Sequence, residues 1–127
     1  MYAINIKPFE IIDSWQQHLN EKNLSEVLKL YDKSCVLVPT FSSEILTDYE
    51  KIKEYFVKVI EVQSSKVEFQ SNSISEQQVG DNIFLLNGKY LFNLMEDKKI
   101  PARFSFLIKI LSKNPIIHHH SSRSISN

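Results

Sequence analysis

The apolar residues change their spacing halfway along the chain, and this change constrains the possible folds more than any other feature. Between residues 9 and 62 they recur at steps of three or four, as Ile12 and Trp15 do, which is the period of an amphipathic helix. From Val67 and Phe69 onward, apolar residues alternate with polar ones, which is the period of a strand. Helices followed by consecutive antiparallel strands predict an α+β domain with the helices on one face of the sheet.

Three helices are expected in the first half of the chain. Pro8 suits the first turn of a helix, because its missing N–H would have no partner there. Asn23 can cap a second, short helix, whose inner face would bury the ring of Tyr31 in the core. Thr47 and Glu50 have the spacing of a capping box at the start of a third helix. The three expected helices span residues 8–21, 23–31 and 47–62.

Five strands are expected, four of them in the second half. The chain contains only two glycines: Gly80 begins a turn, and Gly88 predicts a β-bulge inside a long strand. Phosphate-binding loops and dinucleotide fingerprints need more glycines at fixed spacing, which excludes nucleotide binding through those motifs. The expected strands comprise residues 35–38, a strand that begins at 67, and then 83–95, 100–111 and 116–122.

The two longest expected strands carry apolar residues on both faces. Leu85 and Leu91 lie opposite the apolar face that contains Leu86, and on the next strand Leu107 lies opposite Phe106. An antiparallel sheet with one solvated face alternates more cleanly than this. We therefore expect a second copy of the chain to cover the outer face of the sheet, which would make the protein a homodimer.

The composition is that of an ordinary globular domain, with 43% hydrophobic and 24% charged residues. No linker or repeat divides the 127 residues, so a single domain is expected over 1–127. The 15 basic and 15 acidic residues cancel, so neither nucleic acid nor a membrane is expected as a partner. Residues 1–8 show no leader pattern. The lone Cys35 cannot form an intramolecular disulfide, so we expect a buried thiol and a reducing, cytoplasmic location.

Several segments, taken in order, resemble the nuclear transport factor 2-like superfamily, which includes SnoaL-like proteins. They are Trp15, Leu30-Tyr31 leading to residues 36–39, Pro101-Ala102-Arg103-Phe104, and the histidine-then-serine ending at 117–122. Within the superfamily, the chain is most similar to small bacterial relatives of the calcium/calmodulin-dependent kinase II association (hub) domain. The resemblance implies a cone-shaped, curved antiparallel sheet with three N-terminal helices on its concave face, and a core of residues 8–124. Members include isomerases, cyclases, dehydratases and association domains, so the fold selects no function.

A ligand pocket has five candidate residues, which are Arg103, His118, His120, Tyr31 and Tyr90. On a strand, His118 and His120 share a face and His119 points the opposite way, so at most two of the three could bind one metal ion. Neither a metal nor another cofactor is expected. The resemblance implies that Arg103 and a histidine point into the cone, where they would bind a carboxylate or a similar small anion. The alternative is an edge arginine whose head group extends into water.

One position argues against a known mechanism of the superfamily. Ketosteroid-isomerase-like members carry a carboxylate base directly before the proline that ends the first strand, where this chain has Val38, which cannot accept a proton. The first hypothesis is therefore a dimeric, non-catalytic association or regulatory domain that binds a protein partner and modulates an enzyme. The alternatives are a cone-pocket protein that binds a small anionic ligand, and an isomerase, cyclase or dehydratase with other catalytic groups.

Overall fold

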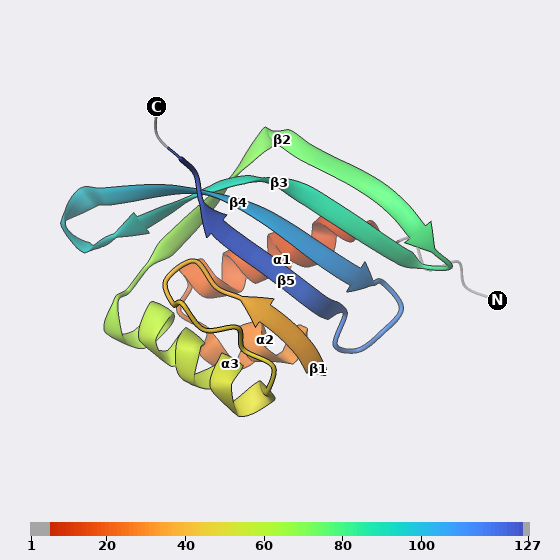
Figure 1. Ribbon diagram of the computed structural model, residues 1–127, viewed down its shortest axis with the longest axis horizontal. Helices are drawn as coiled ribbons and strands as arrows, with labels where there is room; N and C mark the ends of the chain where they lie inside the picture. The colour runs from red at the N-terminus through yellow and green to blue at the C-terminus, as the bar shows by residue number, and fades with distance from the viewer. Residues whose placement is uncertain (1–5, 126–127) are drawn as a thin grey trace.

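The structure, a computed structural model, describes residues 6–125, which form one curved sheet and three α-helices (Figure 1). Of residues 1–8, which were expected to contain no leader, the first five lie outside this range. The helices are α1 (Pro8–Asn20), α2 (Leu24–Lys29) and α3 (Tyr49–Phe56), which continues as the π-helical segment η1 (Val57–Val62). The strands are β1 (Tyr31–Val38), β2 (Lys66–Gly80), β3 (Ile83–Leu94), β4 (Lys98–Lys109) and β5 (Ile116–Arg123), with the 3₁₀ turn η2 (Met95–Asp97) after β3. The predicted α+β class is confirmed.

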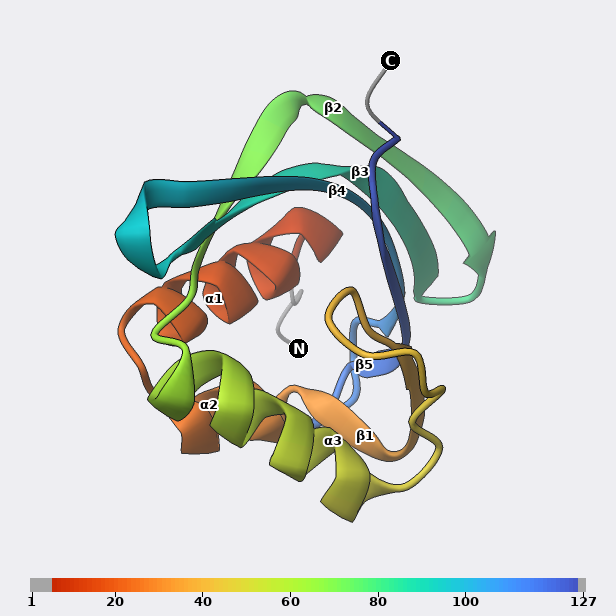
Figure 2. The same ribbon diagram turned by 60° about the vertical axis from the view of Figure 1, so that its left-hand side comes forward.

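The sheet is open, with the strand order β1-β5-β4-β3-β2. Neighbouring strands are antiparallel, as predicted, except for β1 and β5, which run parallel. The first strand also begins earlier than predicted, because Tyr31 pairs with Ile116 as a strand residue instead of ending α2. Figure 2 shows β2, β3 and β4 arching over α1, with α2 and α3 on the other side of α1.

Side chains next to the helices set where the helices begin. The first turn of α1 contains the expected proline, and Asn23 caps α2 by accepting a hydrogen bond from the backbone N–H three residues later. The cap of α3 is Asp48 and not Thr47, because the Asp48 carboxylate accepts hydrogen bonds from the N–H groups of Glu50 and Lys51. None of the described helices is long and apolar enough to cross a membrane.

A register irregularity interrupts β2, not β3. The pairing of β2 with β3 shifts between Gln70 and Ser75, whereas β3 pairs with β4 without a shift. Gly88, predicted as a bulge, is therefore regularly paired, opposite Phe104. Packing explains why this residue is a glycine: a Cβ here would lie 2.9 Å from the ring of Phe104 and 3.1 Å from the side chain of Ile74.

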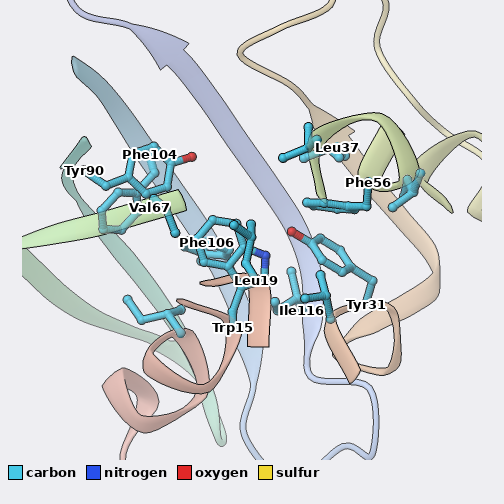
Figure 3. Close-up of a cluster of buried hydrophobic side chains, with 14 of the residues drawn as sticks. Trp15, Leu19, Tyr31, Leu37, Phe56, Val67, Tyr90, Phe104, Phe106 and Ile116 are labelled. Carbon is cyan, nitrogen blue, oxygen red and sulfur yellow. The ribbon is translucent and has the colours of Figure 1, made fainter. Parts of the chain in front are cut away.

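Aromatic rings fill the space between α1 and the sheet (Figure 3). Trp15 of α1 is 1% exposed. Its indole packs against the rings of Tyr90, Phe106 and His119, with ring centroids 5.9, 5.3 and 5.5 Å away. Each such pair stabilises the fold by about 0.5–1.5 kcal/mol beyond the area that it buries. The core expected from the helical and strand periods therefore forms around Trp15.

Replacing Gly88 with alanine is expected to lower the free energy of unfolding by about 1–3 kcal/mol, the usual effect of overpacking. The added methyl group would overlap the ring of Phe104, which is 3% exposed and held by the neighbouring rings. Urea unfolding measures the loss. The matched control is Gly80→Ala, because a Cβ there would meet only Ile83, at an ordinary 3.4 Å. An equal loss in the two variants would contradict the packing explanation.

Candidate functional site

A chain of polar groups crosses the interior of the cone, with the imidazole of His119 at its centre. His119 projects from β5 and is 2% exposed. Its Nδ1 lies 2.8 Å from the hydroxyl oxygen of Tyr31 on β1, and its Nε2 lies 3.1 Å from the hydroxyl oxygen of Tyr90 on β3. The Tyr90 hydroxyl also donates to Ser121, which is hydrogen-bonded to Thr40. Figure 3 shows Tyr31 and Tyr90 entering the interior from opposite sides.

These hydrogen bonds allow one arrangement of protons. Tyr90 donates its only hydroxyl proton to Ser121, so its oxygen accepts from His119, which places a proton on Nε2. A neutral imidazole protonated on Nε2 has a lone pair on Nδ1, and this lone pair accepts from the Tyr31 hydroxyl. The opposite tautomer would leave the Tyr31 proton without an acceptor among the described residues. The imidazole is therefore held in one orientation and one tautomer.

Burial also fixes the charge of these groups. It lowers the pKa of His119 well below the ordinary histidine value, and the nearby His118 and His120 act in the same direction. It raises the pKa values of Tyr31 and Tyr90 well above the ordinary tyrosine value. The imidazole of His119 and the hydroxyls hydrogen-bonded to it are therefore uncharged at neutral pH. It can hold strands together, but none of its members has the pKa near 7 that suits general acid–base catalysis.

Little space is left beside this polar chain. The cavity that borders Trp15, Tyr55, His119 and Ser121 has a volume of about 10 Å³, on the order of the space that one water molecule needs. The indole N–H of Trp15 is buried and makes no hydrogen bond to the residues that the structure describes. Drug-sized ligands occupy cavities of about 300–1,000 Å³, so binding such a molecule in the cone would require these side chains to move.

The structure divides the five predicted pocket residues between the two faces of the sheet. Tyr31 and Tyr90 lie inside the cone and are buried. Arg103 and His120 are exposed on the outer face, where His118 is half-buried. Arg103 and His120 line one hollow, as expected. This hollow lies on the outer face of the sheet, so the prediction that they point into the cone was wrong. Arg103 faces outward because the residues on either side of it along β4 are buried in the core. A ligand-binding role for these residues stays a prediction.

Strand β1 supplies neither a catalytic base nor a nucleophile to the interior. The two positions considered for these roles were Val38 and Cys35. The neighbouring Leu37 is buried and pairs with His119, whereas Val38 pairs with His120 on the outer face. Cys35 is buried, as predicted. Burial raises the pKa of its thiol to about 12, so little of the reactive thiolate forms at neutral pH.

Three members of the polar chain, His119, Ser121 and Thr40, were not predicted as site residues. The alternation that puts His118 and His120 on one face also puts His119 and Ser121 on the other. Alternation alone cannot say which face becomes the inner one. The described residues contain no group of three histidine, cysteine or carboxylate side chains that could hold a metal ion.

Comparisons with known proteins agree with this architecture. The family model of the calcium/calmodulin dependent protein kinase II association domain matches residues 7–125. No curated protein matches the chain. Among solved structures, a Xanthomonas campestris protein assigned as such an association domain is similar, with a TM-score of 0.80 and 26% sequence identity. The match covers 99% of this chain and 95% of that one.

More distant structures share the fold. An NTF2-like protein of unknown function from Shewanella oneidensis has a TM-score of 0.72 at 12% identity, with 90% of this chain and 94% of that one covered. A protein from Novosphingobium aromaticivorans assigned as a scytalone dehydratase has a TM-score of 0.76 at 9% identity, with 92% and 81% covered. These matches confirm the expected cone-shaped, nuclear transport factor 2-like fold. At such identities they say nothing about function.

The order of the protons predicts the tautomer of His119. Nitrogen NMR of the imidazoles at neutral pH should show a proton on Nε2 and none on Nδ1, because Tyr90 donates to Ser121 and cannot also donate to Nε2. Tyr90→Phe removes the acceptor of the Nε2 proton and should shift the His119 signals, while the exposed His120 keeps its own. A proton found on Nδ1 of His119 in the wild-type protein would contradict this order.

The burial of His119 predicts that the protein loses stability in mild acid. The pKa of this imidazole is lower in the folded state than in the unfolded chain, so acid favours the unfolded, protonated form. The free energy of unfolding should fall by up to about 1.4 kcal/mol per pH unit as the pH drops below about 6.5, until the folded pKa is reached. Urea unfolding at a series of pH values measures the slope.

Two glutamine variants serve as test and control for this slope. His119→Gln keeps a donor and an acceptor but cannot titrate, so its slope should be shallower than that of the wild-type protein. His118, whose pKa burial also lowers, keeps its contribution of the same sign in both proteins. His120 is exposed and acts on His119 only from outside the core, so His120→Gln should change the slope less than His119→Gln does. An unchanged slope in His119→Gln would show that another group causes the acid sensitivity.

Proposed function

Because the chain belongs to the calcium/calmodulin dependent protein kinase II association domain family, we propose that it works as an association domain whose outer sheet face binds a second copy of the chain. The paired domain would then bind or hold a partner protein and modulate its activity, rather than convert a substrate. The observation that carries this proposal is a row of apolar side chains on the outer face of the sheet.

This apolar row runs across the strands. Leu85 of β3 and Leu107 of β4 are direct cross-strand partners, and His118 of β5 joins Leu107 to Val36 of β1 in the same register. All four side chains are half-buried in the single chain. Burial lowers the pKa of His118, so its imidazole is neutral at neutral pH and suits an apolar contact. A second copy would remove this row from water, which stabilises a contact by about 25 cal/mol per Å² of apolar surface.

The surroundings of the apolar row fit a contact between identical surfaces. The next outward positions along β5, β4 and β3 are polar: His120, Ser105 and Asn87 stand in register beside the row. An apolar centre with a polar rim is the usual anatomy of a protein interface. A twofold contact uses the same patch on both copies, so one such row is sufficient to make a dimer.

The cone interior gives less support to the other two functions. Its buried hydroxyls and imidazole already bond to one another, and the cavity beside them is about 10 Å³. An isomerase, cyclase or dehydratase would need both a substrate cavity and a poised base. An anionic ligand in the cone would need a cation there, whereas Arg103 lies on the outer face. Association is therefore the better-supported function.

Replacing Leu107 with glutamate should prevent self-association, because a carboxylate in the middle of the apolar row would be buried without a partner. Static light scattering of the wild-type protein at micromolar concentration should give about twice the mass of the chain. Leu107→Glu should give about the mass of one chain and keep a cooperative thermal transition, since its side chain lies outside the core.

The control for this experiment places the same charge elsewhere. Ile45 is 63% exposed in the segment between β1 and α3, so Ile45→Glu should remain a dimer. A wild-type protein with the mass of one chain would refute self-association. A dimer that survives Leu107→Glu would show that the outer face is not the contact.

A further inference from the structure

A hollow of about 480 Å³ lies on the outer face, between the apolar row and the η2 end of the sheet. Strands β2, β3, β4 and β5 all contribute to its lining. Its side chains are mostly of two kinds, positively charged or basic groups and small hydroxyl groups, and it contains no described carboxylate. The composition of the hollow therefore favours a negatively charged occupant.

Three basic side chains meet in this hollow. Lys89 on β3 and Arg103 on β4 stand directly opposite each other, and His120 on β5 is a diagonal neighbour of Arg103. Like charges in a direct cross-strand pair destabilise a sheet. None of the three forms an ion pair with a carboxylate that the structure describes. An anion between Lys89 and Arg103 would replace this repulsion with two attractions.

Uncharged hydrogen-bond donors surround the basic groups. The hydroxyl of Ser105 donates to the side-chain oxygen of Asn87 at 2.6 Å, which leaves the amide nitrogen of Asn87 to donate to a ligand. Ser75 and Ser122 add two more hydroxyl groups to the lining. Donors thus approach from all four strands, which is the arrangement that an oxyanion with several oxygens requires.

The irregular part of β2 forms one wall of the hollow and is held in place by Ser73. The Ser73 hydroxyl accepts a hydrogen bond from the backbone N–H of Lys89 at 2.8 Å and donates to the carbonyl of Gln70 at 2.6 Å. These contacts fix the segment in which the pairing of β2 and β3 shifts register. The hydroxyl of Ser73 therefore anchors the wall to the backbones of β2 and β3.

We propose that this hollow binds a small tetrahedral oxyanion with two negative charges, either inorganic phosphate or the phosphate group of a phosphomonoester. The Arg103 guanidinium can bond two oxygens side by side, and Lys89 supplies a second positive charge. The hydroxyl and amide donors reach the remaining oxygens. A planar carboxylate has only two oxygens and would leave part of this donor set unused. The inference does not depend on self-association, although both use the outer face.

Isothermal titration calorimetry of the full chain with inorganic phosphate, at constant ionic strength with chloride as the reference, tests the site. One phosphate per chain is expected to bind. Arg103→Gln should raise the Kd at least about tenfold, because the forked donor is lost. The control is Arg123→Gln, which removes an exposed arginine that does not line the hollow and should leave the Kd unchanged. Glycerol phosphate distinguishes the sources: if it also binds, the site accepts an esterified phosphate group, and if it does not, the ligand is the free ion.

Three results would overturn the proposal. Phosphate stabilises many proteins because it is excluded from their surface. A response to phosphate that is as large in Arg103→Gln as in the wild-type protein would therefore not come from this site. Succinate binding as tightly as phosphate would rule out a tetrahedral oxyanion as the preferred ligand. Loss of phosphate binding together with the dimer in Leu107→Glu would move the site to the interface between copies. Retained binding in that variant supports the site whatever the fate of self-association.

Discussion

The imidazole of His119 joins two strands that are not neighbours in the sheet. In the strand order, β5 and β4 separate β1 from β3, yet the hydroxyls of Tyr31 and Tyr90 both reach this one ring. Three strand spacings of about 4.8 Å would hold β1 and β3 about 14 Å apart in a flat sheet, with their side chains parallel. The curvature of the sheet shortens this distance on the inner face and turns the two tyrosines toward the same ring. The hydrogen bonds of His119 therefore tie β1, β5 and β3 together across the concave side of the cone.

This curvature gives the two faces of the sheet different properties. On the inner face, α1 closes the concave side, and the rings of Phe106 and His119 stack with centroids 3.9 Å apart. Polar groups there satisfy one another and leave almost no free volume. On the outer face the side chains fall into an apolar row and a donor-rich hollow, neither of which has a partner within the single described chain. The two binding surfaces that we propose therefore both lie on the outer face.

The sequence predicted which histidines of the last strand share a face, but not which face of the sheet becomes the inner one. Period-two alternation placed His118 and His120 on one face and His119 on the other, because successive side chains of a strand point opposite ways. Alternation could not place Tyr31 in β1, because distant contacts make it a strand residue. It pairs with Ile116 of β5, and its hydroxyl is hydrogen-bonded to His119, 88 residues further along the chain. The concave side was likewise set by how bulky rings pack against α1, which no local pattern records.

The sequence of β5 has a consequence for how the strand finds its place. The inner positions are Ile116, His119 and Ser121, and each is followed by a residue of its own kind, so a strand displaced by one residue would present the same three side-chain types to the cone. Composition alone cannot reject this alternative alignment. Contacts at the start of the strand distinguish the two alignments. There the Asn114 side chain donates to the carbonyl oxygen of Lys29, and the backbone N–H of Ile116 donates to that of Leu30, at the end of α2. Correct alignment of the last strand thus depends on hydrogen bonds to the end of a helix near the beginning of the chain.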